Sequence, residues 1–202
     1  MKICIDPGHS GPLEPGACAG GVTEAAIVLQ AAKMLQGMLE KAGHKVKLTR
    51  EDDVEDDGLE WRVELAWKFR ADIYICLHCN AAESEAAHGT EVFYYPTSEG
   101  GRALARCIQT ALVENCHTTD RGIKTNDKWT VLVDTACPAV LVEMAFLTND
   151  WDRSQLTDRF LLRQFAVGIM NGITAFAQGG PLFSGVRESP ATYGIQAFSP
   201  KS

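Results

Sequence analysis

Residues 2–11 of the chain read KICIDPGHSG, and this stretch decides how the fold begins. The first four residues form a short apolar segment of the kind that builds a strand. Asp6, Pro7 and Gly8 then end the strand, because proline and glycine favour turns over extended backbone. His9 therefore lies at the carboxyl end of the first predicted strand, which is the edge where ligands bind in open α/β sheets.

Six segments in all have the composition of strands. They are residues 2–6, 45–49 (KVKLT), 72–77 (DIYICL), 90–95 (TEVFYY), 129–133 (WTVLV) and 139–143 (AVLVE). Helical patterns alternate with most of them, over about residues 23–42 and near 57–70, 99–116 and 157–178. Such alternation is typical of an α/β fold, and strands that are apolar at nearly every residue suit a sheet covered on both sides. We expect a mostly parallel or mixed twisted sheet of about six strands with helices on both faces.

One domain accounts for the chain length. A chain of 202 residues is of ordinary single-domain size. Periodicity ends near residue 178, and residues 179–202 are richer in glycine, proline and serine. We therefore expect a domain over residues 1–178 and a tail or linker over 179–202. Nothing in the sequence indicates an oligomeric state.

Charge and hydropathy argue against two classes of partner. A formal net charge of -7 and a pI of about 5.2 do not suit a nucleic-acid-binding protein, which needs a concentrated basic face. No apolar run has the length of a membrane span, so we expect no membrane insertion. The acidic segment EDDVEDD at residues 51–57 is interpreted as a solvated loop, because it lacks the ligand spacing and central glycine of a calcium loop.

The beginning of the chain and its cysteines bear on the compartment. Residues 1–11 lack the basic start, long apolar stretch and cleavage site of a secretory signal, so we expect synthesis and folding in the cytoplasm. The seven cysteines are odd in number and have no paired spacing. They favour free thiols in a reducing compartment over a disulfide framework.

Several chemistry-bearing side chains gather at strand ends. His9 follows the first strand, His78 follows DIYICL, and Glu143 ends AVLVE. Glu24 begins the first predicted helix, where a carboxylate also complements the helix dipole and Thr23 could act as the N-cap. A single histidine at a strand end is usually a hydrogen-bonded core residue, but the coincidence of three strand ends favours a common site.

Two histidines and a glutamate suit a catalytic zinc ion. His9, Glu24 and His78 supply nitrogen and oxygen ligands, and three protein ligands leave one coordination position open for water. Glu143 is the candidate general acid and base, because a carboxylate at the end of a buried strand can have a raised pKa.

The other candidates fit a metal site less well. His44, His88 and His117 lie in or next to turns away from the strand ends. Cys79 neighbours His78 on an extended segment, so the two side chains point to opposite sides and cannot easily face one ion. We interpret Cys79 as a small buried residue.

The same residues carry a family resemblance. The motif IDPGHSG contains His9, LHCNA contains His78, and PAVLVEMAFLTND contains Glu143. With Glu24 in place between them, the chain resembles the zinc-dependent N-acetylmuramoyl-L-alanine amidases of the amidase_3 type, which occur in bacterial cell-wall hydrolases and phage endolysins. The resemblance covers about residues 1–177, with lesser echoes in GTEVFYY, RGIK and WTVL.

The resemblance implies a substrate and a role for each residue. It implies Zn²⁺ held by His9, Glu24 and His78, with Glu143 as the catalytic glutamate. The bond implied is the peptidoglycan amide between the lactyl group of N-acetylmuramic acid and L-alanine of the stem peptide. With no signal peptide recognised, we expect a phage or prophage endolysin that acts on the wall after a holin opens the membrane. A sporulation or recycling amidase is the alternative within the family.

Two other functions stay open from the sequence. A zinc carboxypeptidase acting on stem peptides would need a cation for a terminal carboxylate, which Arg50, Arg62 or Arg121 could supply. A non-catalytic wall-binding module would need a closed structural zinc site with a fourth protein ligand, which the strand ends do not offer.

Overall fold

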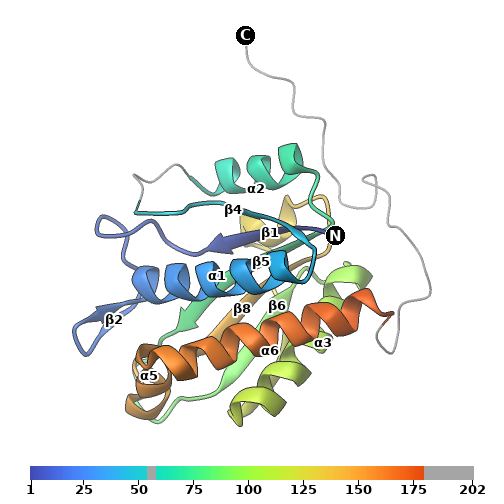
Figure 1. Ribbon diagram of the computed structural model, residues 1–202. Coiled ribbons are helices and arrows are strands. Elements are labelled where there is room, and N and C mark those ends of the chain that lie inside the picture. The colour runs from blue at the N-terminus through green and yellow to red at the C-terminus, as the bar shows by residue number, and fades with distance from the viewer. Residues whose placement is uncertain (54–57, 180–202) are drawn as a thin grey trace.

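Six strands form one mixed sheet in the computed structural model, which describes residues 1–53 and 58–179 (Figure 1). Their order is β4-β1-β5-β8-β6-β7. The strands are β1 (Lys2–Pro7), β4 (Lys45–Leu48), β5 (Ile73–Asn80), β6 (Thr90–Tyr94), β7 (Asp120–Thr125) and β8 (Ala139–Phe146). Strands β4, β1, β5 and β8 are parallel, whereas β6 runs antiparallel to β8 and parallel to β7. The predicted α/β fold with a six-stranded mixed sheet is confirmed.

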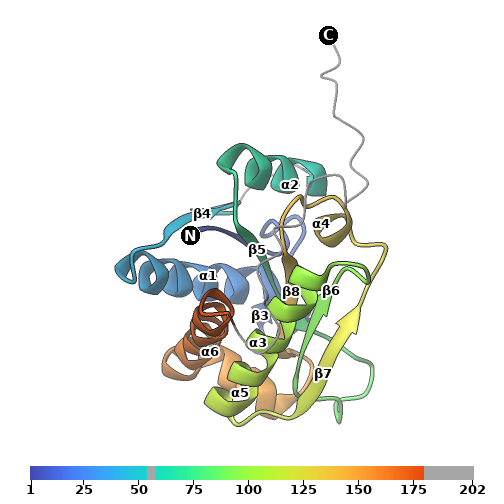
Figure 2. The same ribbon diagram turned by 90° about the vertical axis from the view of Figure 1, so that its right-hand side faces the viewer.

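Helices cover both faces of this sheet (Figures 1 and 2). One layer contains α1 (Glu24–Lys41), α3 (Glu99–Cys116), α5 (Asp150–Thr157) and α6 (Arg159–Ala177). The other contains α2 (Gly58–Phe69) and the short α4 (Thr130–Val133). Because side chains alternate along a strand, Ile3 and Ile5 of β1 face the first layer while Cys4 packs with the second.

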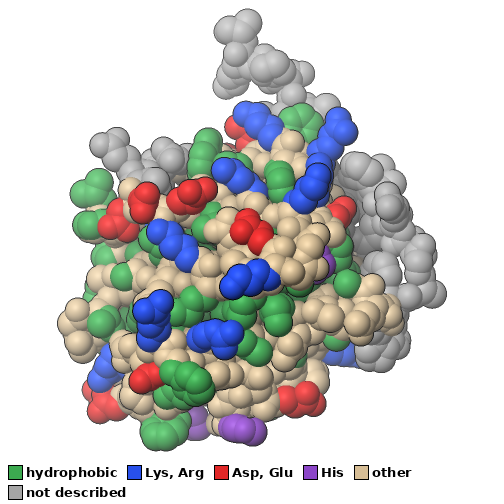
Figure 3. Space-filling model, viewed as in Figure 1, with side chains coloured by type: hydrophobic (Ala, Val, Ile, Leu, Met, Phe, Trp, Pro, Cys, Tyr) green, Lys and Arg blue, Asp and Glu red, His purple; other side chains and the backbone are tan. Residues whose placement is uncertain are grey.

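The outer face over α1 and α6 is mixed in character. Basic, acidic and apolar side chains are interspersed on it, as Figure 3 shows. Within the described part of the chain, α6 is the one helix whose length and composition would suit a membrane span. Its residues Leu162, Phe165, Ile169 and Ile173 pack in the apolar core with α1 and α3.

The prediction of a strand at residues 129–133 is wrong. These residues form the helical turn α4, and the sixth strand is β7, which was not predicted as a strand. The side-chain oxygen of Asn126 accepts hydrogen bonds from the backbone N–H groups of Lys128 and Trp129, which turns the chain just before α4. A short apolar run such as WTVLV fits a buried strand and a buried helical turn equally well, so periodicity alone could not separate them.

Three further elements were not predicted from the sequence. The small antiparallel pair β2 (Cys18–Ala19) and β3 (Val22–Thr23) precedes α1, and α5 begins after Asn149, whose side chain accepts a hydrogen bond from the N–H of Asp152. Of the predicted acidic loop, residues 51–53 are exposed and 54–57 lie outside the described residues. Residues 180–202 also lie outside them, so the predicted tail stays a prediction.

Candidate metal centre

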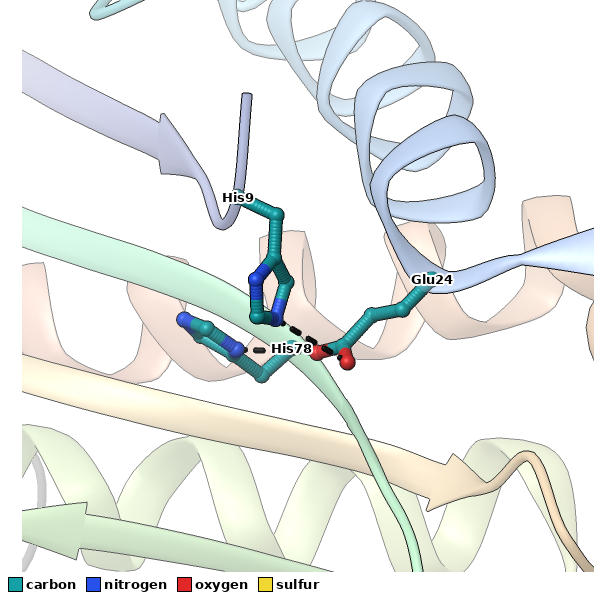
Figure 4. Close-up of side chains that lie close together, drawn as sticks. All are labelled: His9, Glu24 and His78. Carbon is teal, nitrogen blue, oxygen red and sulfur yellow. Dashed lines mark hydrogen bonds and ion pairs between the residues drawn. The ribbon is translucent and has the colours of Figure 1, made fainter. Parts of the chain in front are cut away.

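Three side chains from three elements meet at the carboxyl edge of the parallel strands (Figure 4). His9 follows β1, Glu24 opens α1, and His78 lies near the end of β5. Glu24 stands between the imidazoles: its Oε2 is 3.0 Å from His9 Nε2 and its Oε1 is 2.8 Å from His78 Nδ1. One donor atom from each residue lies within 4.8 Å of the other two. The predicted ligand residues are therefore brought together.

Local backbone geometry explains how the loops approach so closely. His9 has a φ of 62°, in the left-handed region that non-glycine residues seldom occupy. A Cβ at Gly8 would lie 2.4 Å from His78 Nε2, and a Cβ at Gly16 would lie 2.5 Å from His9 Nε2. Gly16 also has a φ of +67°. Glycine is thus required at both positions for the two imidazoles to face Glu24.

Two buried arginines hold the loop that carries His9. Arg62 donates from Nη1 to the carbonyl of Pro7 (2.9 Å) and from Nη2 to the carbonyl of His9 (2.6 Å). Arg50 donates from Nη2 to the carbonyl of Gly8 (2.9 Å) and from Nε to that of Pro7 (3.0 Å). Since bonds to three successive carbonyls fix the backbone path, these arginines act as positioning residues for His9.

The buried carboxylate of Asp6 holds Arg62 in position. Asp6 accepts from Arg62 Nη1 at 2.6 Å and from the hydroxyl of Tyr74 at 2.7 Å. Burial alone would raise the pKa of Asp6, but the Arg62 guanidinium and the Thr49 hydroxyl hold it below its usual range. Asp6 is therefore a structural anion that keeps Arg62 in place.

Glu14 is a site residue that the sequence reasoning missed. Its carboxylate contacts His9 Nδ1, the ring nitrogen that does not face Glu24. The turn that delivers it is closed by the backbone N–H of Ser10 donating to the carbonyl of Glu14 at 3.2 Å. Carboxylates commonly orient metal-binding imidazoles in this way. A glutamate in the turn directly after a candidate histidine ligand was the available signal.

The charges of the cluster suit a cation. Burial lowers the pKa of His9, but its bonds to Glu24 and Glu14 outweigh that and raise it to about 9. Burial lowers the pKa of His78, but the bond to Glu24 and the negative charges of Glu143 and Glu24 together outweigh burial and raise that pKa. Glu24 has a lowered pKa, because its two histidine partners overcome desolvation. In the metal-free protein, protons on the imidazoles thus compensate the anionic carboxylate, and a divalent cation can replace them.

Glu143 lies next to this cluster on β8. Its Cα is paired with that of His78 on β5 and with that of Glu91 on β6. Among the described residues, its Oε2 is buried and has no hydrogen-bond partner. Burial raises the pKa of Glu143 to about 7, against the opposing effect of His78 and with smaller contributions from Glu24 and Glu91. A carboxyl group in this state can accept and return a proton near neutral pH.

The remaining histidines and Cys79 lie apart from the cluster. His44 Nδ1 is near the N-terminal amino group, His88 Nδ1 faces the Thr119 hydroxyl, and His117 is the left-handed C-cap of α3. Cys79 packs in the main apolar core, and only its backbone N–H reaches the site, where it donates to Glu24 Oε1 at 2.9 Å.

Comparison with known proteins gives a consistent picture. Residues 3–175 match the sequence profile of the Amidase_3 family, described as N-acetylmuramoyl-L-alanine amidase. The chain is 35% identical to N-acetylmuramoyl-L-alanine amidase LytC of Bacillus subtilis over 176 residues, which cover 86% of this chain but 35% of LytC. It is 32% identical to the probable cell wall amidase LytH of Staphylococcus aureus, covering 57% of that protein. The chain thus spans only part of these relatives.

Solved structures share the fold. The amidase AmiC2 of Nostoc punctiforme is 31% identical, with a TM-score of 0.82 over 88% of this chain and 97% of that one. The catalytic domain of the CD27L endolysin is 27% identical, with a TM-score of 0.74 over 86% of this chain and 97% of that one. The resemblance drawn from the sequence motifs is confirmed.

Proposed function

The chain belongs to the N-acetylmuramoyl-L-alanine amidase family, and from that premise we propose that it hydrolyses the amide between N-acetylmuramic acid and L-alanine in peptidoglycan. The observation that carries the proposal is the meeting of His9, Glu24 and His78 beside the unpartnered Oε2 of Glu143.

Zinc is the cofactor that fits this donor set. Two imidazoles and one carboxylate converge, and no fourth ligand joins them among the residues that the structure describes. Such a set is that of a catalytic zinc site, whereas a structural site would be closed by four protein ligands. When bound, zinc supplies a Lewis acid that polarises the scissile carbonyl. The three-ligand set therefore disfavours the non-catalytic wall-binding module.

The chain's own residues account for the proton transfers. Glu143 Oε2 takes a proton from the attacking water and then gives it to the nitrogen of the departing L-alanine, so the carboxylate is regenerated in each cycle. A pKa of about 7 suits both steps near neutral pH. Arg50 and Arg62 hold the His9 loop, and Glu14 orients the His9 ring.

The carboxypeptidase alternative needs a cation to bind the terminal carboxylate of the substrate, and two of the three candidate arginines are buried. The side chains of Arg50 and Arg62 are 1% and 8% exposed, and both are bonded to backbone carbonyls. They are not available to bind the terminal carboxylate of a substrate. Arg121 alone of the three has substantial exposure, and a single such residue does not favour the peptidase over the amidase.

Product analysis tests the proposed bond. Purified peptidoglycan is digested by the zinc-loaded protein, and new amino termini are labelled and identified by mass spectrometry. We expect L-alanine termini on otherwise intact stem peptides. Stem peptides shortened at their carboxyl ends would instead establish the carboxypeptidase and contradict the proposal.

For the biological role we propose a phage or prophage endolysin, made in the cytoplasm and released to the wall through a holin pore. The likeness to the catalytic domain of the CD27L endolysin supports it. Dependence of lysis on a co-expressed holin, measured in the producing cell, tests this role against that of a sporulation or recycling amidase.

A further inference from the structure

A pair of cations lies on the side of Glu143 away from the metal centre. Arg121 and Lys124 belong to β7, and both contact the same oxygen, Oε2 of Glu91: Arg121 Nε at 2.7 Å and Lys124 Nζ at 2.5 Å. Glu91 also accepts from Asn80 Nδ2 at 2.9 Å. Because the Cα of Glu91 is paired with that of Glu143, the cation pair lies beyond Glu91, two strands from the candidate general base.

This group carries a net positive charge that solvent can reach. The single carboxylate of Glu91 faces the two cations. Unlike the buried Arg62, the side chains of Arg121 and Lys124 are 34% and 40% exposed. Each is also supported by an aromatic ring, with Arg121 4.7 Å from the ring centroid of Phe146 and Lys124 5.8 Å from that of Phe93. The cation pair is therefore held in place while retaining surface for a ligand.

Two exposed carboxylates lie on the opposite side of the metal centre. They belong to Glu14 and Asp53, next to the His9 loop, and their side chains are 49% and 56% exposed. These carboxylates are near β1, whereas the cation pair is on β7 at one end of the strand order. A substrate with a neutral sugar on one side of the scissile amide and carboxylates on the other would be oriented with its peptide toward β7.

The spacing matches a short peptide. Neighbouring strands are about 4.8 Å apart, so β7 lies about 10 Å from β8, which carries Glu143. The long side chains of the cation pair reach back over Glu91 and shorten this distance. An extended peptide covers about 3.5 Å per residue. A group on the residue after L-alanine would therefore arrive near Arg121 and Lys124.

We propose that Arg121 and Lys124 bind the free α-carboxylate of the stem residue that follows L-alanine and so determine specificity for that carboxylate. The inference rests on the proposed amidase function. The second stem residue is glutamate linked through its side-chain carboxyl, and its α-carboxyl is either free or amidated. A guanidinium and an ammonium together discriminate between a carboxylate and a neutral amide.

Two muramyl tripeptides that differ only in this group test the proposal. For each we would measure kcat/KM for release of the peptide by the full chain. We expect the substrate with the free carboxylate to be preferred about tenfold or more, since hydrogen bonds between charged groups are strong. The double variant Arg121→Gln/Lys124→Met should bring the ratio of the two kcat/KM values close to one.

Matched variants separate specificity from folding. Arg102→Gln on α3 and Lys68→Met on α2 remove exposed cations elsewhere and should keep the parental ratio. Arg121→Lys keeps the charge and should retain most of the preference. Equal cleavage of both substrates by the parent, or an unchanged ratio in the folded double variant, would overturn the specificity while leaving the amidase intact. Failure of the parent to cut either substrate before L-alanine would overturn both proposals.

Discussion

His9 and His78 share a single carboxylate, that of Glu24, and each imidazole is therefore a base whose proton is stabilised by an anion. His9 has a second anionic partner in Glu14. The same contacts that would orient a metal ligand thus favour protonation when no metal is bound. Metal and protons compete for one cluster, and pH controls the competition.

We expect zinc binding near pH 7 to release protons. The pKa of His9 is raised to about 9 in the metal-free cluster, so its ring is protonated at pH 7 and zinc must displace that proton. Since the proton is lost as pH rises toward 9, zinc affinity should increase from pH 6 to 8, by about tenfold per pH unit for each displaced proton. Calorimetry in buffers of different ionisation enthalpy counts the protons.

The variant Glu14→Gln is the control for this measurement. It removes one of the anions that raise the His9 pKa, so fewer protons should be released at pH 7 than by the parent. Affinity that does not change between pH 6 and 8 would contradict the linkage.

The residues of the site differ in how far the sequence could identify them. His9, His78 and Glu143 stand at the ends of apolar strands, a position that periodicity and turn chemistry reveal. Glu14 needed the turn geometry that folds it back onto His9. Arg50 and Arg62 looked like candidate substrate clamps, and only the long-range contacts with the carbonyls of residues 7–9 show that they hold the loop.

At the scale of elements, α3 and α6 come together through glycine. A Cβ at Gly172 would lie 2.5 Å from the Cα of Ile108 and 2.9 Å from the carbonyl oxygen of Cys107, both backbone atoms of α3. The helices could not approach so closely with a larger residue. By contrast, a Cβ at Gly37 in α1 would meet no atom within 4 Å.

Two alanine substitutions should therefore have opposite effects on stability. Gly172→Ala should lower the free energy of unfolding by about 1–3 kcal/mol, because the helices must move apart. Gly37→Ala should raise it by about 0.5–1 kcal/mol, because alanine has the higher helix propensity. Urea denaturation followed by circular dichroism measures both. A Gly172→Ala protein as stable as the parent would show that the α3–α6 contact is not tight.

The long helices could be predicted from the periodicity of apolar residues, whereas the edge strand β7 could not. Strand β7 (DRGIKT) has few apolar residues and no fully buried one, so it lacks the pattern of a core strand. It is held by pairing with β6 and by the contacts of Arg121 and Lys124 with Glu91. These contacts are between residues about thirty positions apart in sequence, and local propensity contains no information about them.

At the scale of the whole molecule, the candidate functional residues follow the order of the strands in the sheet. The loop after β1 brings His9, β5 brings His78, β8 brings Glu143, β6 brings Glu91, and β7 brings the two cations. The proposed metal ligands, the proposed general base and the proposed carboxylate site therefore follow one another along a single edge. This order would place the scissile amide between zinc and Glu143 with the stem peptide extending toward β7.

The measurement that most directly tests the central claim is made on the Glu143→Gln variant. Zinc content, determined by atomic absorption, and release of L-alanine amino termini from purified peptidoglycan are compared with those of the parent. We expect the variant to bind as much zinc as the parent and to release no termini above background, because the amide cannot carry the proton. A zinc-loaded variant that digests peptidoglycan at close to the parental rate would contradict the role of Glu143 and the mechanism built on it.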